Sequence, residues 1–439
     1  MDDSRRVATL VGVLFGIASM GSSSAAIALA PMAQDLGIEV STAVWTISLY
    51  VLMLGVTTAL YGRISDLVGV RAPLAAGVGM MTAGAMLAAL APGYELHLVG
   101  RLVQGAGAAA VPTLGVVVLT ARYDGPVRSL ALGRLAGMAA VVGGLGPLGG
   151  GLVEATLGWR GVMAVPMLGL LVLPWIWHAL DSEGVRGRLD VVGACLVALA
   201  AAGLVLLVQS PSTDVVFAVA GCALLATGVP AVVLWVRREP GGFLPLVVVR
   251  NATLVRSAVA AAALPAGWFA LLVAAPAVLV LEGWEPWQVG LLLVPGALTG
   301  FFTPRLSGRL IERLGASASL AVASVGGSLS LVLAAVGVWQ LWPPLLTLSI
   351  MLNTACFSLG QPALLRAVGD SADADVRGVA LGVAMLLFLT GGSVGSAVVG
   401  GLNGVVGYAV SLLVLAALPL LAAAGLQPDV RAHRRGPGR

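Results

Sequence analysis

One arginine of this sequence, Arg101, lies inside a long apolar stretch. A charged side chain at the centre of a membrane-spanning helix costs about 2.5–3.5 kcal/mol on insertion scales, so such a residue is a functional candidate by default. No Asp or Glu lies in the middle of an apolar stretch, and the nearest candidate partners are the carboxylates of Glu154 and of Asp35 or Glu39 at the ends of such stretches. Glu154 or Asp35 could bind and release a proton, with Arg101 tuning the pKa of that carboxylate. His97, one helical turn from Arg101, is a weaker candidate for the proton.

The competing interpretation is that these carboxylates are solvated loop charges. Whether they form a proton site or lie in solvent depends on the helices that carry them. Of the 439 residues, 59% are hydrophobic and 10% are charged, against about 25% charged in soluble proteins, and the mean hydropathy is +1.01. Within a bilayer a chain must satisfy its own backbone hydrogen bonds, which favours helices of about 20 residues. We therefore predict an all-α integral membrane protein with fourteen spans, near residues 7–30, 43–61, 72–91, 97–120, 131–153, 159–179, 190–208, 214–236, 255–281, 287–304, 317–338, 341–361, 376–400 and 403–425.

The positions of the arginines predict an orientation. All 24 basic residues are arginine, and if the amino terminus is cytoplasmic, only Arg101 and Arg160 fall outside the cytoplasmic loops and tails. Cytoplasmic loops are enriched in basic residues. The pattern therefore predicts a multi-pass protein of the cytoplasmic membrane with both termini in the cytoplasm. We expect the apolar run at 7–30 to be retained as the first span and not cleaved as a secretory signal.

Two short charged segments recur along the chain. The segment 62–71 reads Gly-Arg, two residues, an acid, two residues and Gly, and this spacing returns at 308–315, 246 residues later; 127–133 likewise returns at 376–382, 249 residues later. Each segment lies between apolar runs, where a tight turn is expected. Two segments repeated in the same order indicate a duplicated unit. The predicted organisation is an N-terminal six-helix bundle (1–180), a two-helix insert with cytoplasmic linkers (181–254), a C-terminal six-helix bundle (255–425) and a cytoplasmic tail (426–439).

The distribution of reactive and basic residues excludes several classes of protein. An enzyme embedded in the membrane would need His, Asp, Glu or Cys clustered at membrane depth, and no such cluster occurs, so we expect no enzyme activity, no metal and no cofactor. The arginines are scattered among short loops and form no patch for nucleic acid. The histidines, at helix ends or in the tail, and the cysteines, far apart within apolar runs, are His97, His178, His433, Cys195, Cys222 and Cys356.

Taken together, these segments resemble the major facilitator superfamily, specifically its fourteen-helix drug:proton antiporter branch, over nearly the whole chain. The order and spacing of three motifs carry the resemblance. One position departs from the family: its first helix commonly carries an embedded Asp, and here Ser22 stands at that place. The matching residues are Gly62, Asp66, Gly69 and Arg71 after the second span, Arg101, Gln104, Gly105 and Gly107 in the fourth, and Gly146, Pro147, Gly149 and Gly150 in the fifth.

The resemblance implies a transport function. A member of this branch would export hydrophobic or amphipathic drug-like compounds or secondary metabolites by proton antiport and alternating access. Its partners would be a small-molecule substrate, protons and membrane lipids, and it would act as a monomer. The missing acid of the first helix leaves an alternative open, an uncoupled facilitator of lipids or small solutes with the same fold.

The resemblance also implies a gating role for the segment with Gly62, Asp66, Gly69 and Arg71. In the family this segment latches the cytoplasmic side in the outward-facing state. The Asp66 carboxylate would cap a helix amino terminus and pair with an arginine such as Arg122 at the end of the fourth span. The alternative for Asp66 is a solvated loop charge.

The fifth span carries the motif Gly146-Pro147-Leu148-Gly149-Gly150. Its glycines permit close helix packing, and Pro147 removes one helical hydrogen bond, so the helix can bend there. A hinge and a merely tight contact both remain open. Either would exclude a bulky side chain.

The last group of candidates comprises aromatic, methionine and weakly polar side chains near the middle of the spans. By analogy with the family they would line a central cavity, although helix packing explains each of them equally well. As a set they suit bulky amphipathic organic molecules better than sugars or phosphates. These residues are Met20, Ser22, Ser23, Tyr50, Gln104, Trp268 and Asn353.

Overall fold

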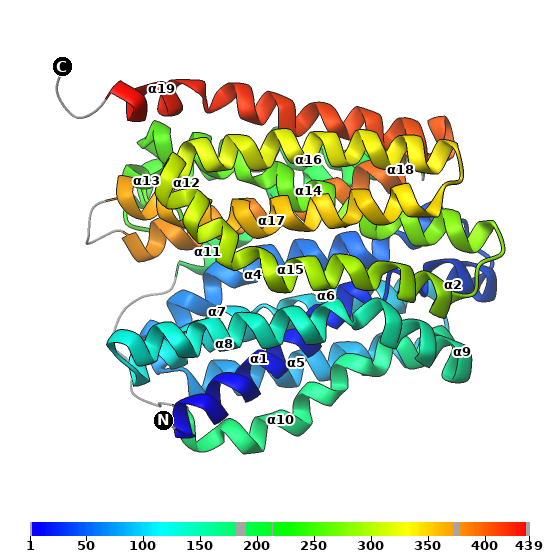
Figure 1. Ribbon diagram of the computed structural model, residues 1–439, viewed down its shortest axis with the longest axis horizontal. Helices are drawn as coiled ribbons and strands as arrows, with labels where there is room; N and C mark the ends of the chain where they lie inside the picture. Colours follow the sequence, from blue (N-terminus) through cyan, green and yellow to red (C-terminus); the bar gives the residue numbers. More distant parts are fainter. Residues whose placement is uncertain (1, 181–189, 213, 373–376, 436–439) are drawn as a thin grey trace. The chain divides into compact units, whose positions relative to one another are not determined.

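The computed structural model describes residues 2–180, 190–212, 214–372 and 377–435, which fold into helices with no strand among them (Figure 1). This confirms the prediction of an all-α membrane protein. Backbone contacts divide the chain into two compact units, one formed by residues 1–189 with 279–301 and the other by 190–278 with 302–439. The division falls within two helices, because the last residues of α14 and the first part of α15 belong to the first unit.

The first unit contains the helices that carry most of the candidate residues. Its long helices are mostly apolar, as expected for helices that face lipid on one side and the interior of the bundle on the other. They are α1 (Asp2–Ser23), α2 (Leu29–Leu36), α3 (Val40–Ala43), α4 (Trp45–Val68), α5 (Arg71–Leu90), α6 (Tyr94–Ala108), α7 (Ala110–Arg122), α8 (Gly125–Gly144), α9 (Gly146–Ala164) and α10 (Gly169–Ile176), with the start of α15 (Pro286–Leu314).

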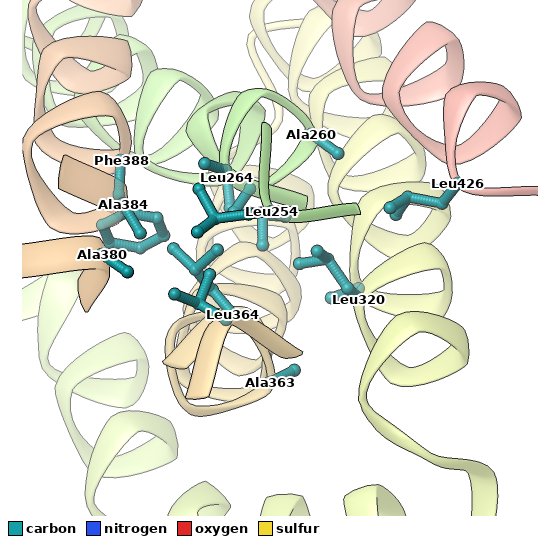
Figure 2. Packing of buried hydrophobic residues seen from close by; sticks show 14 of the residues in the cluster. Leu254, Ala260, Leu264, Leu320, Ala363, Leu364, Ala380, Ala384, Phe388 and Leu426 are labelled. Atoms are coloured by element: carbon teal, nitrogen blue, oxygen red, sulfur yellow. The ribbon is translucent and has the colours of Figure 1, made fainter. Parts of the chain in front are cut away.

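The second unit is built around a core of small and branched apolar side chains. In Figure 2, Leu264 of α14, Leu364 of α17 and Phe388 of α18 belong to this buried cluster. Helices α11 and α12 pack on each other, and α11 also packs on α18. The helices of this unit are α11 (Val191–Gln209), α12 (Val215–Arg238), α13 (Leu246–Arg250), α14 (Ala252–Leu281), the rest of α15, α16 (Ala316–Trp339), α17 (Pro343–Ser371), α18 (Arg377–Gly425) and α19 (Gln427–Arg435).

The described residues contain eleven helical stretches long and apolar enough to cross a membrane, or up to twelve if the bent pair 286–303 and 306–314 forms one span. Two of these stretches, Leu130–Ala179 and Val379–Arg431, hold 50 and 53 residues, whereas about 20 residues suffice for one crossing. The helix is interrupted in each, at Gly158 and at Gly407. Fourteen crossings would require both stretches to cross twice, so the count of fourteen stays a prediction.

The backbone itself repeats with the offset found in the sequence. Three glycines with positive φ in the first half have counterparts in the second half, 246, 246 and 249 residues later, as the residue numbers show. A positive φ favours glycine because other residues have a side chain that clashes there. The pairs are Gly37 (φ 64°) with Gly283 (88°), Gly69 (75°) with Gly315 (82°) and Gly158 (65°) with Gly407 (77°).

The segment 62–71 is less of a turn than the sequence suggested. Helix α4 continues to Val68 and α5 begins at Arg71, so only Gly69 and Val70 lie between them. The expected tight turn starting at Gly62 is therefore wrong: none of the residues before Gly69 breaks a helix, and Gly69 is the first with a positive φ. The second copy behaves in the same way, with α15 helical to Leu314.

Candidate functional site

The guanidinium of Arg101 is fully buried and joins three helices of the first unit. From α6, its Nε donates to the carbonyl oxygen of Thr46 on α4 at 2.9 Å. Its two terminal nitrogens donate to the carbonyl oxygen of Gly21 on α1 at 2.6 Å and to Gln104 Oε1 at 2.5 Å. The ring centroid of Tyr50 lies 4.4 Å from the guanidinium carbon. Oxygen dipoles and an aromatic face therefore stabilise this charge.

The carboxylate partners that we expected for Arg101 are wrong. Asp35 pairs with Arg160, and Glu39 accepts a hydrogen bond from Ser41. The carbonyl of Gly21 can take the place of a carboxylate because α1 ends at Ser23, and carbonyls in the last turn of a helix have no amide of that helix to accept from. Arg101 thus holds helices together through their main chains.

His97 is also fully buried, with both ring nitrogens engaged. Nδ1 lies 3.0 Å from the carbonyl oxygen of Ala88, which can only accept, so Nδ1 carries the hydrogen. Nε2 then accepts from Thr46 Oγ1 at 3.2 Å. The ring stacks on Tyr94 and meets Trp159 edge to face, at centroid distances of 5.9 and 5.6 Å. These contacts satisfy a neutral imidazole, and Thr46 links it to Arg101.

Asp35 is a surface carboxylate that accepts hydrogen bonds from two side chains of α9 in the first unit. Trp159 Nε1 donates to its Oδ2 at 2.9 Å, and an Arg160 terminal nitrogen donates to the same oxygen at 2.5 Å. The hydrogen bond from Trp159, followed by that from Arg160, lowers the pKa of Asp35 below its ordinary value of 3.8. Asp35 is therefore ionised at neutral pH and is a poor acceptor for a proton there.

Glu154 is the candidate carboxylate with a different environment. It lies half-buried on α9 and makes no salt bridge within the described ranges. A backbone contact brings it toward a second acid: a Cβ at Gly151, one turn earlier, would lie 2.6 Å from the carbonyl oxygen of Pro286. Glu285 immediately precedes that proline, so the contact brings together two segments that each carry an acid. The two helices thus bring like charges together.

The fifth-span motif is folded as a break between two helices that lies against α1. Helix α8 ends at Gly144 and α9 begins at Gly146, with Pro147 in its first turn, where its missing amide is tolerated. A Cβ at Gly146 would overlap Ser23 Oγ, and one at Gly150 would lie 2.7 Å from the Cβ of Ser24. Met20 Cε lies 3.4 Å from the corresponding position at Gly149. Bulky residues do not fit at Gly146 and Gly150 in this structure.

The opposite side of the same span contacts the start of α15. A Cβ at Gly144 would lie 2.5 Å from the Cβ of Ala297, and one at Gly290 would lie 2.6 Å from the carbonyl oxygen of Pro147. Together with the contact of Gly151 described above, these glycines let two backbones approach closely. The glycines of this span therefore permit close contacts with α1 on one side and with the start of α15 on the other, and they flank the break between α8 and α9.

Two of the gating candidates, Arg122 and Arg71, have partners that the sequence did not indicate. Arg122 donates to Asp3 at 3.2 Å, and both side chains are substantially exposed. The start of α1 thus supplies an acid to Arg122. The side chain of Asp66 lies outside the described atoms, so its pairing with Arg122 stays a prediction. Arg71 donates to the carbonyl oxygen of Leu180 at 3.0 Å. At Gly62, a Cβ would meet only one atom, at 3.7 Å, so close packing does not require glycine there.

The cavity candidates divide into buried and accessible side chains. Met20 and Trp268 are partly exposed, and Trp268 lies 6.3 Å from the ring of Phe357, which sequence reasoning missed because no motif marks it. The other five are buried and hydrogen-bonded. They are Ser22 (to the carbonyl oxygen of Ser19), Ser23 (to those of Ser19 and Gly143), Tyr50 (to that of Ala18), Gln104 (to Arg101) and Asn353 (to Ser330).

Long apolar helices, close glycine contacts and a buried, hydrogen-bonded charge are typical of a membrane protein with tightly packed spans. Residues 11–395 match the Major Facilitator Superfamily. The chain belongs to this family of membrane transporters, as its motifs predicted.

Solved structures show the same fold. A POT family transporter in complex with 5-aminolevulinic acid superposes with a TM-score of 0.71 at 13% identity, covering 97% of this chain and 96% of that chain. A peptide transporter POT in complex with alafosfalin superposes with a TM-score of 0.70 at 16% identity, covering 97% and 94%. At these identities the likeness concerns the fold alone.

Curated relatives are similar over part of their length. They include the uncharacterized MFS-type transporter EfpA of Mycobacterium tuberculosis (33% identical over 43% of this chain and 36% of the relative) and the cephamycin export protein CmcT of Amycolatopsis lactamdurans (33%, over 41% and 38%). The multidrug resistance protein Stp of M. tuberculosis is 28% identical over 62% of this chain and 52% of its own. The chain thus spans between about a third and about a half of the relatives it matches.

Proposed function

We propose that this chain is a secondary transporter that exports hydrophobic or amphipathic small molecules, such as drugs or secondary metabolites, across the cytoplasmic membrane in exchange for protons. Membership of the family supports transport. Relatives named for cephamycin export and multidrug resistance support the outward direction. The arginine distribution supports fourteen crossings with both termini in the cytoplasm.

The accessible side chains of the second unit support this substrate class. Trp268 and Phe357 are both half-buried, and Phe357 in turn lies 5.3 Å from the ring of Phe388. Gln361 and Met385 lie on the same helices as Phe357 and Phe388, 3.9 Å apart. Aromatic and methionine side chains adapt to bulky apolar ligands of varied shape. A single amide beside them fits a weakly polar compound and does not fit a sugar or a phosphate.

The proton site that we propose is Glu154, and the observation that supports it is the close contact of α9 with the start of α15 at Gly151, which brings together the segments that hold Glu154 and Glu285. Asp35 is already neutralised by Arg160, and Arg101 and His97 are satisfied by neutral partners. A single proton bound by Glu154 would relieve the repulsion between the two carboxylates. Its binding would thereby favour the close contact of α9 with the start of α15.

The cytoplasmic latch stays part of the proposal. Asp66, with Gly62, Gly69 and Arg71, would alternate between partners as the transporter changes state. The bond from Arg71 to the carbonyl oxygen of Leu180 ties the start of α5 to the end of the first bundle. Such a tie supports a latch at this end of the helices.

Everted membrane vesicles test this proposal. With an acidic lumen, vesicles that contain the protein are expected to accumulate a fluorescent hydrophobic substrate, and an uncoupler should abolish the accumulation. Vesicles without the protein are the control. Accumulation that ignores the gradient would replace proton antiport by the alternative, an uncoupled facilitator, which the absence of an acid at Ser22 favours. No accumulation of any amphipathic compound would contradict export.

A further inference from the structure

The carbonyl oxygen of Gly143 lacks its usual helical donor. In a continuous helix it would accept from the amide four residues later, and that residue is Pro147, which has no N–H. The amide of Leu145 points toward the carbonyl oxygens of both Gly143 and Val141, but its hydrogen bond with regular geometry is the one to Val141, at 3.0 Å, so it gives Gly143 no full hydrogen bond. Gly143 is buried, and the contact that its carbonyl oxygen makes with α1 is buried as well. A buried carbonyl without a partner is costly, and some other group is expected to donate to it.

Ser23 of α1 supplies that donor. Its Oγ lies 3.1 Å from the carbonyl oxygen of Gly143 and 3.3 Å from that of Ser19 in its own helix. The neighbouring Ser22, in α1, and Ser24, just after its end, donate to carbonyl oxygens of α1 itself, those of Ser19 and Met20. Bonding within the helix is the ordinary behaviour of serine in membrane helices. Ser23 is the one of these three that reaches another helix.

The backbone geometry keeps the two groups together. Gly146 has no side chain in the place that Ser23 Oγ occupies, so the hydroxyl can pass between the helices. On the same face, a Cβ at Gly16 of α1 would lie 3.1 Å from the amide nitrogen of Gly143. The glycines thus bring α1 close enough to α8 for a serine, the shortest hydroxyl side chain, to reach the open carbonyl.

We propose that Ser23 is a positioning residue that replaces the missing amide of Pro147 and thereby couples α1 to the break in the fifth span. Hydroxyl groups satisfy freed backbone groups at proline breaks in other membrane helices. Here the bond has a mechanical consequence: a change of bend at Leu145–Pro147 must either carry α1 with it or break the bond. While the bond is intact, the break moves together with α1, the helix whose Gly21 carbonyl also accepts from Arg101.

A double-mutant cycle tests this inference, which rests on the proposed function only for its transport readout. In Pro147→Ala the alanine amide can donate to Gly143, so the hydroxyl becomes redundant. Ser23→Ala alone is expected to lower the maximal export rate by about two- to tenfold, the range for one hydrogen bond, with the apparent affinity unchanged. The same change in the Pro147→Ala background should have less than about a twofold effect. Ser24→Ala is the matched control and should be neutral, because Ser24 donates to the carbonyl oxygen of Met20 and not to another helix. Ser23→Thr, which keeps a hydroxyl, should retain the rate.

The thermal unfolding midpoint of the purified protein without substrate gives a second readout of the same cycle. It is expected to fall for Ser23→Ala in the wild-type background and to be unaffected by that change in Pro147→Ala. If wild type exports nothing but this coupling is found, the proposed function fails and the inference stands. Equal effects of Ser23→Ala in both backgrounds, or an equal effect of Ser24→Ala, would overturn the inference.

Discussion

Replacing Arg101 by methionine tests whether this residue is a structural clamp or a tuner of a proton site. Arg101→Met keeps much of the side-chain volume and removes the charge. Two hydrogen bonds to other helices are lost, to the carbonyl oxygens of Thr46 and Gly21. Hydrogen bonds from a charged group contribute about 1.5–3 kcal/mol each, so we expect the free energy of unfolding to fall by about 3–6 kcal/mol. The lost contact with the ring of Tyr50 adds to this change.

The assay is unfolding of the purified protein in mixed micelles, followed by the loss of folded fraction as the share of denaturing detergent rises. Arg160→Met is the matched control, because Arg160 bonds an exposed carboxylate and its removal should change the unfolding little. Equal stability of the two variants would refute the clamp. Unchanged stability of Arg101→Met together with a shifted pH profile of export would instead make Arg101 a tuner of the proton site.

Three further predictions concern topology, packing and pH. In a background without the native cysteines, Arg186→Cys should react with an impermeant thiol reagent in everted membranes only, and labelling of intact cells would contradict the orientation. Gly151→Leu should abolish export by an inserted protein, because its side chain would meet the backbone of α15, whereas Gly133→Leu, with no atom within 4 Å of its Cβ position, should be tolerated; equal losses would contradict the packing argument. Because the pKa of Asp35 lies below 3.8, its hydrogen bonds are complete at neutral pH and are lost only as the pH falls through that lower value. Asp35→Asn should therefore leave the pH profile of export between about pH 5 and pH 8 unchanged, and a shifted profile would return Asp35 to the proton site.

The fold class could be predicted because composition and periodic apolar runs follow directly from the demands of a bilayer. The duplication could be predicted as well, since the offset between 62–71 and 308–315 returns in the glycines with positive φ. The length of each helix could not. Residues after Gly62 are charged enough to resemble a loop, yet they continue α4, because charge does not end a helix and a glycine such as Gly69 does.

The site was harder to predict because main-chain groups do not appear in a residue pattern. Arg101 stood out as costly, but its partners are carbonyl oxygens, which every residue has. The bond from Ser23 to Gly143 arises from a missing amide, at a distance of 120 residues. Glu285 lies 131 positions from Glu154, as their numbers show, and only the helix contact at Gly151 brings the two together.

The most direct test of proton-coupled export is to follow the proton itself. Proteoliposomes with the cytoplasmic face of the protein outward would enclose a pH-sensitive dye and receive an exported substrate from outside. Exchange predicts that the lumen becomes alkaline as substrate enters, and that Glu154→Gln abolishes this change. Substrate entry into wild-type proteoliposomes without any change in lumenal pH would contradict the account.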